Sequence, residues 1–145
     1  NLDARLILHE KDYPMVIDPK YNMSERWEKA TDLRNYRSRM SFVKENDVLE
    51  FDGCQMKVIE IPGHTPGHIA LVCEADGIVL TGDTLFKGSV GNCIFDGADA
   101  DLMFKSIKEK LLSLPDEMRV FPGHGEDTTI GDEKEDNMFI MHLLD

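Results

Sequence analysis

The sequence predicts an α/β layered domain. Short apolar runs bounded by turn residues fill residues 48–80, an amphipathic helix pattern follows over residues 101–114, and a further apolar strand and a helical segment come after it. The chain has 145 residues and is 41% hydrophobic and 30% charged. This composition predicts a single globular domain spanning residues 1–145.

The N-terminal third has weaker patterns than the rest of the chain. Residues 6–9 predict a strand, followed by a helical turn with Asp12 as its cap and Pro14 in its first turn. Residues 24–40 allow two interpretations. With Ser24 as N-cap they form a helix with a thin apolar stripe, or they form a mobile surface excursion.

The middle of the chain is strand-like. Residues 48–51 and 54–61 predict a hairpin, because Asp52-Gly53 favours the tight turn that joins two antiparallel strands. Residues 69–73 and 78–80 are apolar without alternation, which is typical of strands covered on both faces.

The remaining elements alternate between helix and strand. Residues 101–114 predict a helix that Pro115 ends, and residues 119–121 predict a strand. A final helical segment is expected around residues 133–144. The helix over 101–114 places its apolar residues on one face: Met103, Phe104, Ile107, Leu111 and Leu114.

Charge and cysteine usage exclude several classes of protein. The 16 Lys and Arg residues against 28 Asp and Glu residues give a net charge of −12, which repels nucleic acid and anionic lipid. We therefore expect neither a nucleic-acid nor a membrane partner. Cys54, Cys73 and Cys93 lack the spacing of a metal motif, which indicates reduced thiols in a cytoplasmic protein. Cys54 and Cys73 lie in apolar strands and are expected to be inert.

Three glycine-containing loops carry the residues best suited to chemistry. Each follows a predicted strand, and they present His64, Asp83 and His124. Two imidazoles and one carboxylate suit a divalent transition metal and leave positions open for water and substrate. The loops therefore predict a metal site.

The other polar residues have more ordinary interpretations. We expect His68 and Thr65 to orient the His64 loop through hydrogen bonds and not to bind the metal. His9 and His142 are interpreted as ordinary core or surface histidines. The acidic residues from 126 to 136 are interpreted as a solvated face and a helix start.

The loop motifs resemble a known family. IPGHTPGH, LTGDTLF and FPGHG followed by TTIGDE are similar to the metallo-β-lactamase superfamily, within it the glyoxalase II-like (hydroxyacylglutathione hydrolase-like) branch. The resemblance implies an αββα sandwich with two zinc ions between its sheets, or a mixed zinc/iron site, and manganese is a further option. It implies that His64 binds the first metal, that Asp83 bridges both metals and is catalytic, and that His124 binds the second. A small-molecule thioester or ester is the implied substrate.

One departure from the family is large. The HxHxDH motif, which supplies further metal ligands in the family, does not occur in this sequence. The chain is thus expected to be the C-terminal portion of the sandwich, an incomplete domain shortened by design or by proteolysis. We expect it to hold one ion weakly or none, to be inactive or nearly so, and to form a homodimer or a strand-swapped assembly, or to remain bound to the missing N-terminal piece.

Two other functions stay open at this point. One is a mononuclear iron enzyme similar to the persulfide dioxygenases, which use a His/His/Asp set. The other is a non-catalytic half-domain that acts as an assembly subunit. The identity of the bound metal and the consumption of oxygen distinguish the dioxygenase-like enzyme from a hydrolase. Alanine at His64, Asp83 and His124 with intact partner binding would identify the second.

Overall fold

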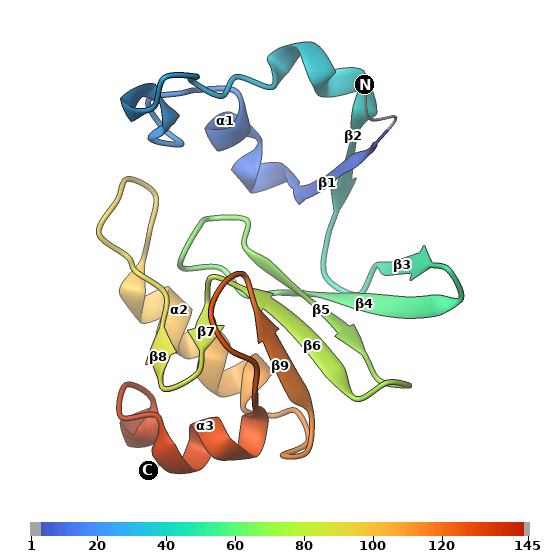
Figure 1. Cartoon of the computed structure of the whole chain (residues 1–145), viewed down its shortest axis with the longest axis vertical. Helices are drawn as coiled ribbons and strands as arrows, with labels where there is room; N and C mark the ends of the chain where they lie inside the picture. The colour runs from blue at the N-terminus through green and yellow to red at the C-terminus, as the bar shows by residue number, and fades with distance from the viewer. Residues whose placement is uncertain (1–3, 144–145) are drawn as a thin grey trace.

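The computed structural model describes residues 4–143, and its main body is a six-stranded mixed sheet (Figure 1). Neighbouring strands of this sheet are antiparallel except for one parallel pair, Ile78–Gly82 beside Arg119–Pro122. The predicted hairpin at Asp52-Gly53 is confirmed, and it joins the strands Val48–Phe51 and Cys54–Glu60. In spatial order the strands are β10 (Thr128–Thr129), β9 (Arg119–Pro122), β6 (Ile78–Gly82), β5 (Ile69–Cys73), β4 (Cys54–Glu60) and β3 (Val48–Phe51).

Two helices cover one face of this sheet. Helix α2 (Ala100–Ser106) continues into a π-helical turn, Ile107–Leu111, so the predicted helix over 101–114 is confirmed over most of its length. Helix α3 (Ile130–Asp136) begins earlier than predicted, because the Thr129 side chain accepts a hydrogen bond from the backbone of Asp132 and caps it. The core lies between the helices and this sheet face and includes Ala70, Val72, Val79, Val120, Met103, Ile107, Leu111 and Ile130.

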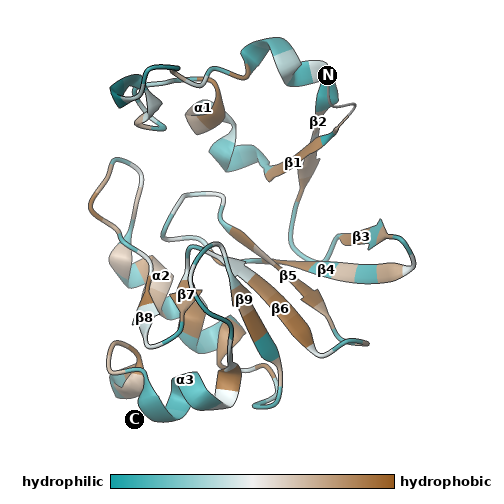
Figure 2. Cartoon of the chain, in the orientation of Figure 1, coloured by the Kyte–Doolittle hydropathy of each residue, from teal (hydrophilic) through white to brown (hydrophobic). Residues whose placement is uncertain are grey.

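The opposite sheet face is only partly covered. Leu71 lies opposite Leu80, and Leu80 lies opposite Phe121, and all three side chains are half-buried. In Figure 2 the central strands are largely apolar, whereas α3 is largely polar. The expectation that residues 69–73 and 78–80 are covered on both faces is therefore wrong within residues 4–143. Burial alternates along both strands except at Cys73, which is buried like Val72 before it.

Residues 4–43 form a separate small layer. Strand β1 (Leu6–His9) pairs in parallel with β2 (Met40–Val43), and α1 (Tyr13–Val16) lies between them in sequence. The predicted strand over 6–9 and the helical turn containing Pro14 are confirmed, whereas β2 was not predicted.

The helix interpretation of residues 24–40 is wrong. Only short 3-10 turns form, at Ser24–Arg26 and Arg34–Arg39. Trp27 is 76% exposed and Ala30 is also exposed, so most of the thin apolar stripe does not pack, and an isolated helix of this length is marginal without such packing. The Ser24 hydroxyl accepts a hydrogen bond from the Thr31 backbone instead of capping a helix.

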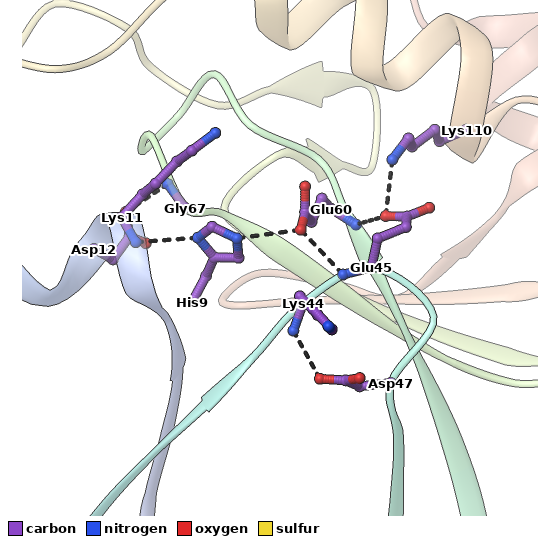
Figure 3. A network of polar contacts seen from close by, with 9 residues as sticks. All are labelled: His9, Lys11, Asp12, Lys44, Glu45, Asp47, Glu60, Gly67 and Lys110. Carbon is purple, nitrogen blue, oxygen red and sulfur yellow. Dashed lines mark hydrogen bonds and ion pairs between the residues drawn. The ribbon is translucent and has the colours of Figure 1, made fainter.

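Polar contacts join this layer to the sheet (Figure 3). His9 Nε2 lies 3.1 Å from Glu60 Oε1 on β4, and the Glu45 backbone donates to the same oxygen. Lys110, after α2, forms a 2.9 Å ion pair with Glu45. Among residues 4–143, no helix has the length and apolar character that crossing a bilayer would require.

Candidate metal centre

Three loops meet at one edge of the six-stranded sheet. Strands β4, β6 and β9 run in the same direction, because β4 and β6 are each antiparallel to β5 and β6 is parallel to β9. Each loop that follows these strands carries one predicted ligand: His64, Asp83 and His124. The prediction that the three residues follow strand ends is confirmed.

Asp83 lies between the two histidines. Its Oδ2 is 3.9 Å from His64 Nε2, and its Oδ1 is 3.8 Å from His124 Nε2. Both distances are too long for hydrogen bonds. Each carboxylate oxygen thus faces a different imidazole, and neither oxygen is hydrogen-bonded to the imidazole that it faces.

The orientation of His64 is defined by a backbone contact. His64 Nδ1 donates a 2.8 Å hydrogen bond to the Asn92 carbonyl, which leaves the Nε2 lone pair directed toward Asp83. The ring also contacts Phe95 edge to face, with centroids 5.0 Å apart. The tautomer that a metal ligand needs is therefore already selected.

His124 is held less tightly than His64. Its side chain is 74% exposed, compared with 17% for His64. Its ring stacks on Phe86 at a centroid distance of 4.5 Å and an interplanar angle of 26°. Phe86 belongs to β7 (Leu85–Phe86), which pairs with β8 (Ser89–Val90) in a small hairpin that was not predicted.

Two glycines permit the close approach of these loops. A Cβ at Gly123 would lie 2.3 Å from Asp83 Oδ1, which is too short for two non-bonded atoms and would be a steric clash. Gly82 has φ +53°, and a Cβ there would lie 2.7 Å from His68 Nε2. Side chains at these positions would displace Asp83 or His68.

His68 and Thr65 both hold the His64 loop through hydrogen bonds. His68 Nε2 donates to the Thr81 carbonyl at 3.1 Å, and burial lowers the pKa of His68, with the hydrogen bond to Thr81 opposing and the charge of His64 assisting. His68 is therefore a neutral imidazole at neutral pH. The Thr65 hydroxyl donates to Asp12 Oδ2 at 2.6 Å, and the Gly67 backbone donates to Asp12 Oδ1 at 2.6 Å.

Asp12 has a different role from the one predicted. It precedes α1, but its side chain makes no capping hydrogen bond. Its two oxygens accept instead from Thr65 and Gly67 of the His64 loop, which are 53 and 55 residues away in sequence. No local pattern in the sequence indicates a contact of this separation.

The acidic segment also contains an exception. Glu133 is 2% exposed, so its assignment to a solvated face is wrong. Its carboxylate accepts from the Thr128 hydroxyl at 2.7 Å, from the Asn137 amide at 2.7 Å and from the Gly88 backbone at 3.0 Å. These bonds fasten α3 to the β7–β8 hairpin beside the site.

The three predicted ligands line one cleft of about 520 Å³. Lys87 at its rim forms a 2.7 Å ion pair with Glu126, which raises the pKa of Lys87. The cleft is thus a pocket with apolar and charged walls around a polar centre. Its lining comprises Met23, His64, Asp83, Phe86, Lys87, Ser89, Val90, Asn92, Phe95, His124, Gly125 and Glu126.

Comparison with known proteins decides the family. The family model described as the metallo-beta-lactamase superfamily matches residues 2–124. The chain belongs to the metallo-beta-lactamase superfamily. The fold class inferred from the loop motifs is confirmed by this match and by the solved structures below.

Relatives within the superfamily agree with the predicted branch. The chain is 40% identical over 99 residues to hydroxyacylglutathione hydrolase GloC of Haemophilus influenzae, covering 68% of this chain and 47% of that protein. The structure of BLEG-1 B3 metallo-beta-lactamase matches with a TM-score of 0.83 and 30% identity, covering 94% of this chain and 65% of that one. TTHA1623 in a di-iron-bound form matches with a TM-score of 0.78 and 36% identity, covering 95% and 66%. The chain thus spans about half to two thirds of the length of these relatives.

Proposed function

We propose that this chain supplies His64, Asp83 and His124 to the dinuclear metal centre of a hydrolase that cleaves thioesters such as hydroxyacylglutathione. The observation that carries this proposal is the position of Asp83, whose two oxygens face two different imidazoles. A carboxylate placed in this way suits a bridge between two ions. The name of the Haemophilus influenzae relative supports the substrate class, and superfamily membership supports hydrolysis.

The donor set fits divalent metal ions. Zinc lies about 2.0–2.1 Å from an imidazole nitrogen and about 2.0–2.2 Å from a carboxylate oxygen. An ion bonded to both a histidine nitrogen and a carboxylate oxygen can therefore span a separation of up to about 4.2 Å between these two atoms. The separations in the two Asp83–histidine pairs, 3.9 and 3.8 Å, lie within this limit. We propose zinc as the metal. The di-iron form of TTHA1623 shows that iron binds in one relative.

The chain's own residues prepare the site for this chemistry. A pair of divalent cations lowers the pKa of bound water and polarises the scissile carbonyl. Asn92 holds His64 in the ligating tautomer, and His68 stays neutral and adds no positive charge near the ions. The apolar side chains of Phe86, Val90 and Phe95 line the cleft beside the proposed ligands. A thioester suits this site because a thiolate leaves with little acid assistance.

Three ligands are fewer than two ions require. We propose that the other sheet of the family's sandwich provides the remaining ligands and covers the half-buried row of Leu71, Leu80 and Phe121. The relatives support a second sheet in this position, because about a third to a half of their length lies outside the region that matches this chain. Size-exclusion chromatography with light scattering tests it: a stable complex with an HxHxDH-bearing segment is expected, and a self-sufficient dimer of this chain would contradict it.

Metal content and hydrolysis of S-lactoylglutathione test the activity in the protein as its gene encodes it. We expect two zinc-class ions per protein. Asp83→Asn should lower kcat/KM by more than about 100-fold, beyond the usual loss for groups that only support a ligand. His142→Ala is the matched control, because His142 contacts Phe104 outside the cleft and the variant should keep its activity. A single iron with oxygen uptake, or full activity in Asp83→Asn, would overturn the proposal.

A further inference from the structure

Two cysteines and one aspartate converge at a second place in the fold. Cys54 is the first residue of β4, Cys73 is the last of β5, and Asp76 lies in the turn before β6. The two sulfurs are 3.0 Å apart, and Asp76 Oδ2 lies 3.3 Å from the sulfur of Cys73 and 3.7 Å from that of Cys54. Among all His, Cys, Asp and Glu side chains within residues 4–143, Cys54, Cys73 and Asp76 form the set of three whose potential ligand atoms all lie within 4.8 Å of one another.

This cluster is remote from the candidate metal centre. Strands β4, β5 and β6 carry His64, His68 and Asp83 in the loops at one end, and the cluster lies at the other end of the same strands. Strand β4 has seven residues, and at about 3.3 Å per residue the two ends are roughly 20 Å apart. The cluster therefore belongs to a separate site.

The chemistry of the cluster favours a cation. The hydrogen bond to Cys73, burial, and then the charge interactions with Cys73 and Asp76 raise the pKa of Cys54 to about 11. Without a metal, the Cys54 thiol therefore keeps its proton at neutral pH beside the Asp76 carboxylate. A thiophilic cation would replace the thiol protons and bring positive charge to the two sulfurs and the carboxylate together.

The dimensions of the cluster match a tetrahedral ion. With metal–sulfur bonds of about 2.3 Å and a metal–oxygen bond of about 2.1 Å, the ligand atoms of a tetrahedral site are about 3.8 Å apart between sulfurs and about 3.6 Å between sulfur and oxygen. The sulfur–oxygen distances of 3.3 and 3.7 Å bracket the second value, and the sulfurs need to separate by less than 1 Å to reach the first. A disulfide would use the two sulfurs and leave the carboxylate without a role.

We propose that Cys54, Cys73 and Asp76 bind a thiophilic divalent cation such as Zn²⁺ or Cd²⁺. Cys73 is buried, Cys54 is half-buried and Asp76 is exposed, so an ion enters from the solvent side. The fourth position stays open to water. The expectation that both cysteines are inert is replaced by this proposal.

Titration of the reduced chain with Cd²⁺ tests the proposal, because thiolate-to-cadmium charge transfer absorbs in the ultraviolet and histidine and aspartate ligands give no such band. The titration uses a Cys93→Ser background, since Cys93 contacts Gly63 and Met103 and not the cluster. One equivalent of Cd²⁺ should produce the band. Asp76→Asn should weaken binding by about tenfold or more, and Cys54→Ser should abolish the band.

Other results would overturn the proposal. Asp76 lies on an exposed turn, so its variant tests the site even where Cys54→Ser fails to fold. An unchanged affinity in Asp76→Asn, or a reduced protein that gives no band, contradicts the site. His64→Ala and His124→Ala should leave the band unaltered, and its loss in either variant would show that the cluster is not separate. The outcome is therefore independent of the proposed hydrolase.

Discussion

The two faces of the six-stranded sheet differ in what covers them. Val72, Val79 and Val120 are aligned across β5, β6 and β9, and all three are buried under the helices. Their sequence neighbours Leu71, Leu80 and Phe121 form the matching row on the other face and are half-buried. The two rows have similar apolar character, so the difference comes from what packs on them and not from the residues themselves.

The difference shows where the chain obtains its stability. The helix-covered face forms a closed core with α2 and α3. Residues 4–43 are attached at the ends of the strands through polar contacts, notably Glu60 with His9 and Asp12 with the His64 loop, and the other face stays half-buried. Burial of apolar surface stabilises a fold more than exposed polar contacts do. We therefore expect substitutions to cost most on the helix side.

The same substitution on the two sides gives the largest expected effect. Leu111 is fully buried against the helix-covered face, and Leu111→Ala should lower the free energy of unfolding by about 2–5 kcal/mol. Leu80→Ala on the other face should lower it by about 1–2 kcal/mol, since part of that side chain already contacts water. Urea denaturation followed by circular dichroism measures both. Equal losses would show that the second face is as well packed as the first.

The sequence predicted the helix-covered face better than the other. Asp52-Gly53, the apolar strands and the stripe of Met103, Ile107 and Leu111 all act locally, and each predicted its element. Glycine loops after strands also predicted which residues gather at the cleft, because parallel strand ends meet at one edge. The alternation of burial in β5 and β6 could not be predicted, since apolar residues on both faces look alike before their cover is known.

Long-range polar partners were beyond sequence reasoning. Asp12 and Glu133 look like ordinary surface acids in the sequence. Asp12 accepts hydrogen bonds from the His64 loop, and Glu133 accepts one from the Gly88 backbone, and in both cases only the fold brings the partners together. The segment over 24–40 carried a helical pattern, but most of its apolar stripe, including Trp27, is exposed and no helix forms. In each case tertiary contacts and not local preference decided the outcome.

Removal of the Asp12 carboxylate should produce the next largest effect. Asp12→Ala leaves the Gly67 backbone N–H and the Thr65 hydroxyl without their acceptor, which should cost about 1–3 kcal/mol. Hydrogen exchange should rise in residues 61–68 and in β1, while the core under α2 stays protected. Asp12→Asn is the matched control, because its amide oxygen still accepts one of the two bonds and the loss should be smaller. Unchanged exchange in the loop would show that this contact does not hold it.

The smallest effect concerns pH and the Glu60 contact with residues 4–43. The hydrogen bond from the Glu45 backbone, assisted by His9, lowers the pKa of Glu60 below its ordinary value of 4.5. A carboxyl whose pKa is lower in the folded state binds protons more tightly when unfolded, so its contribution is fully present above pH 4.5 and is lost as the pH falls further. Glu60→Gln should therefore lower the free energy of unfolding at pH 7 by under about 1 kcal/mol, as for other partly exposed pairs, and the difference from the wild type should vanish in acid. Urea denaturation at a series of pH values from neutral to acidic measures this. A difference that persists at low pH would mean that Glu60 acts through packing and not through its charge, and the attachment of residues 4–43 would then resemble the helix-covered side.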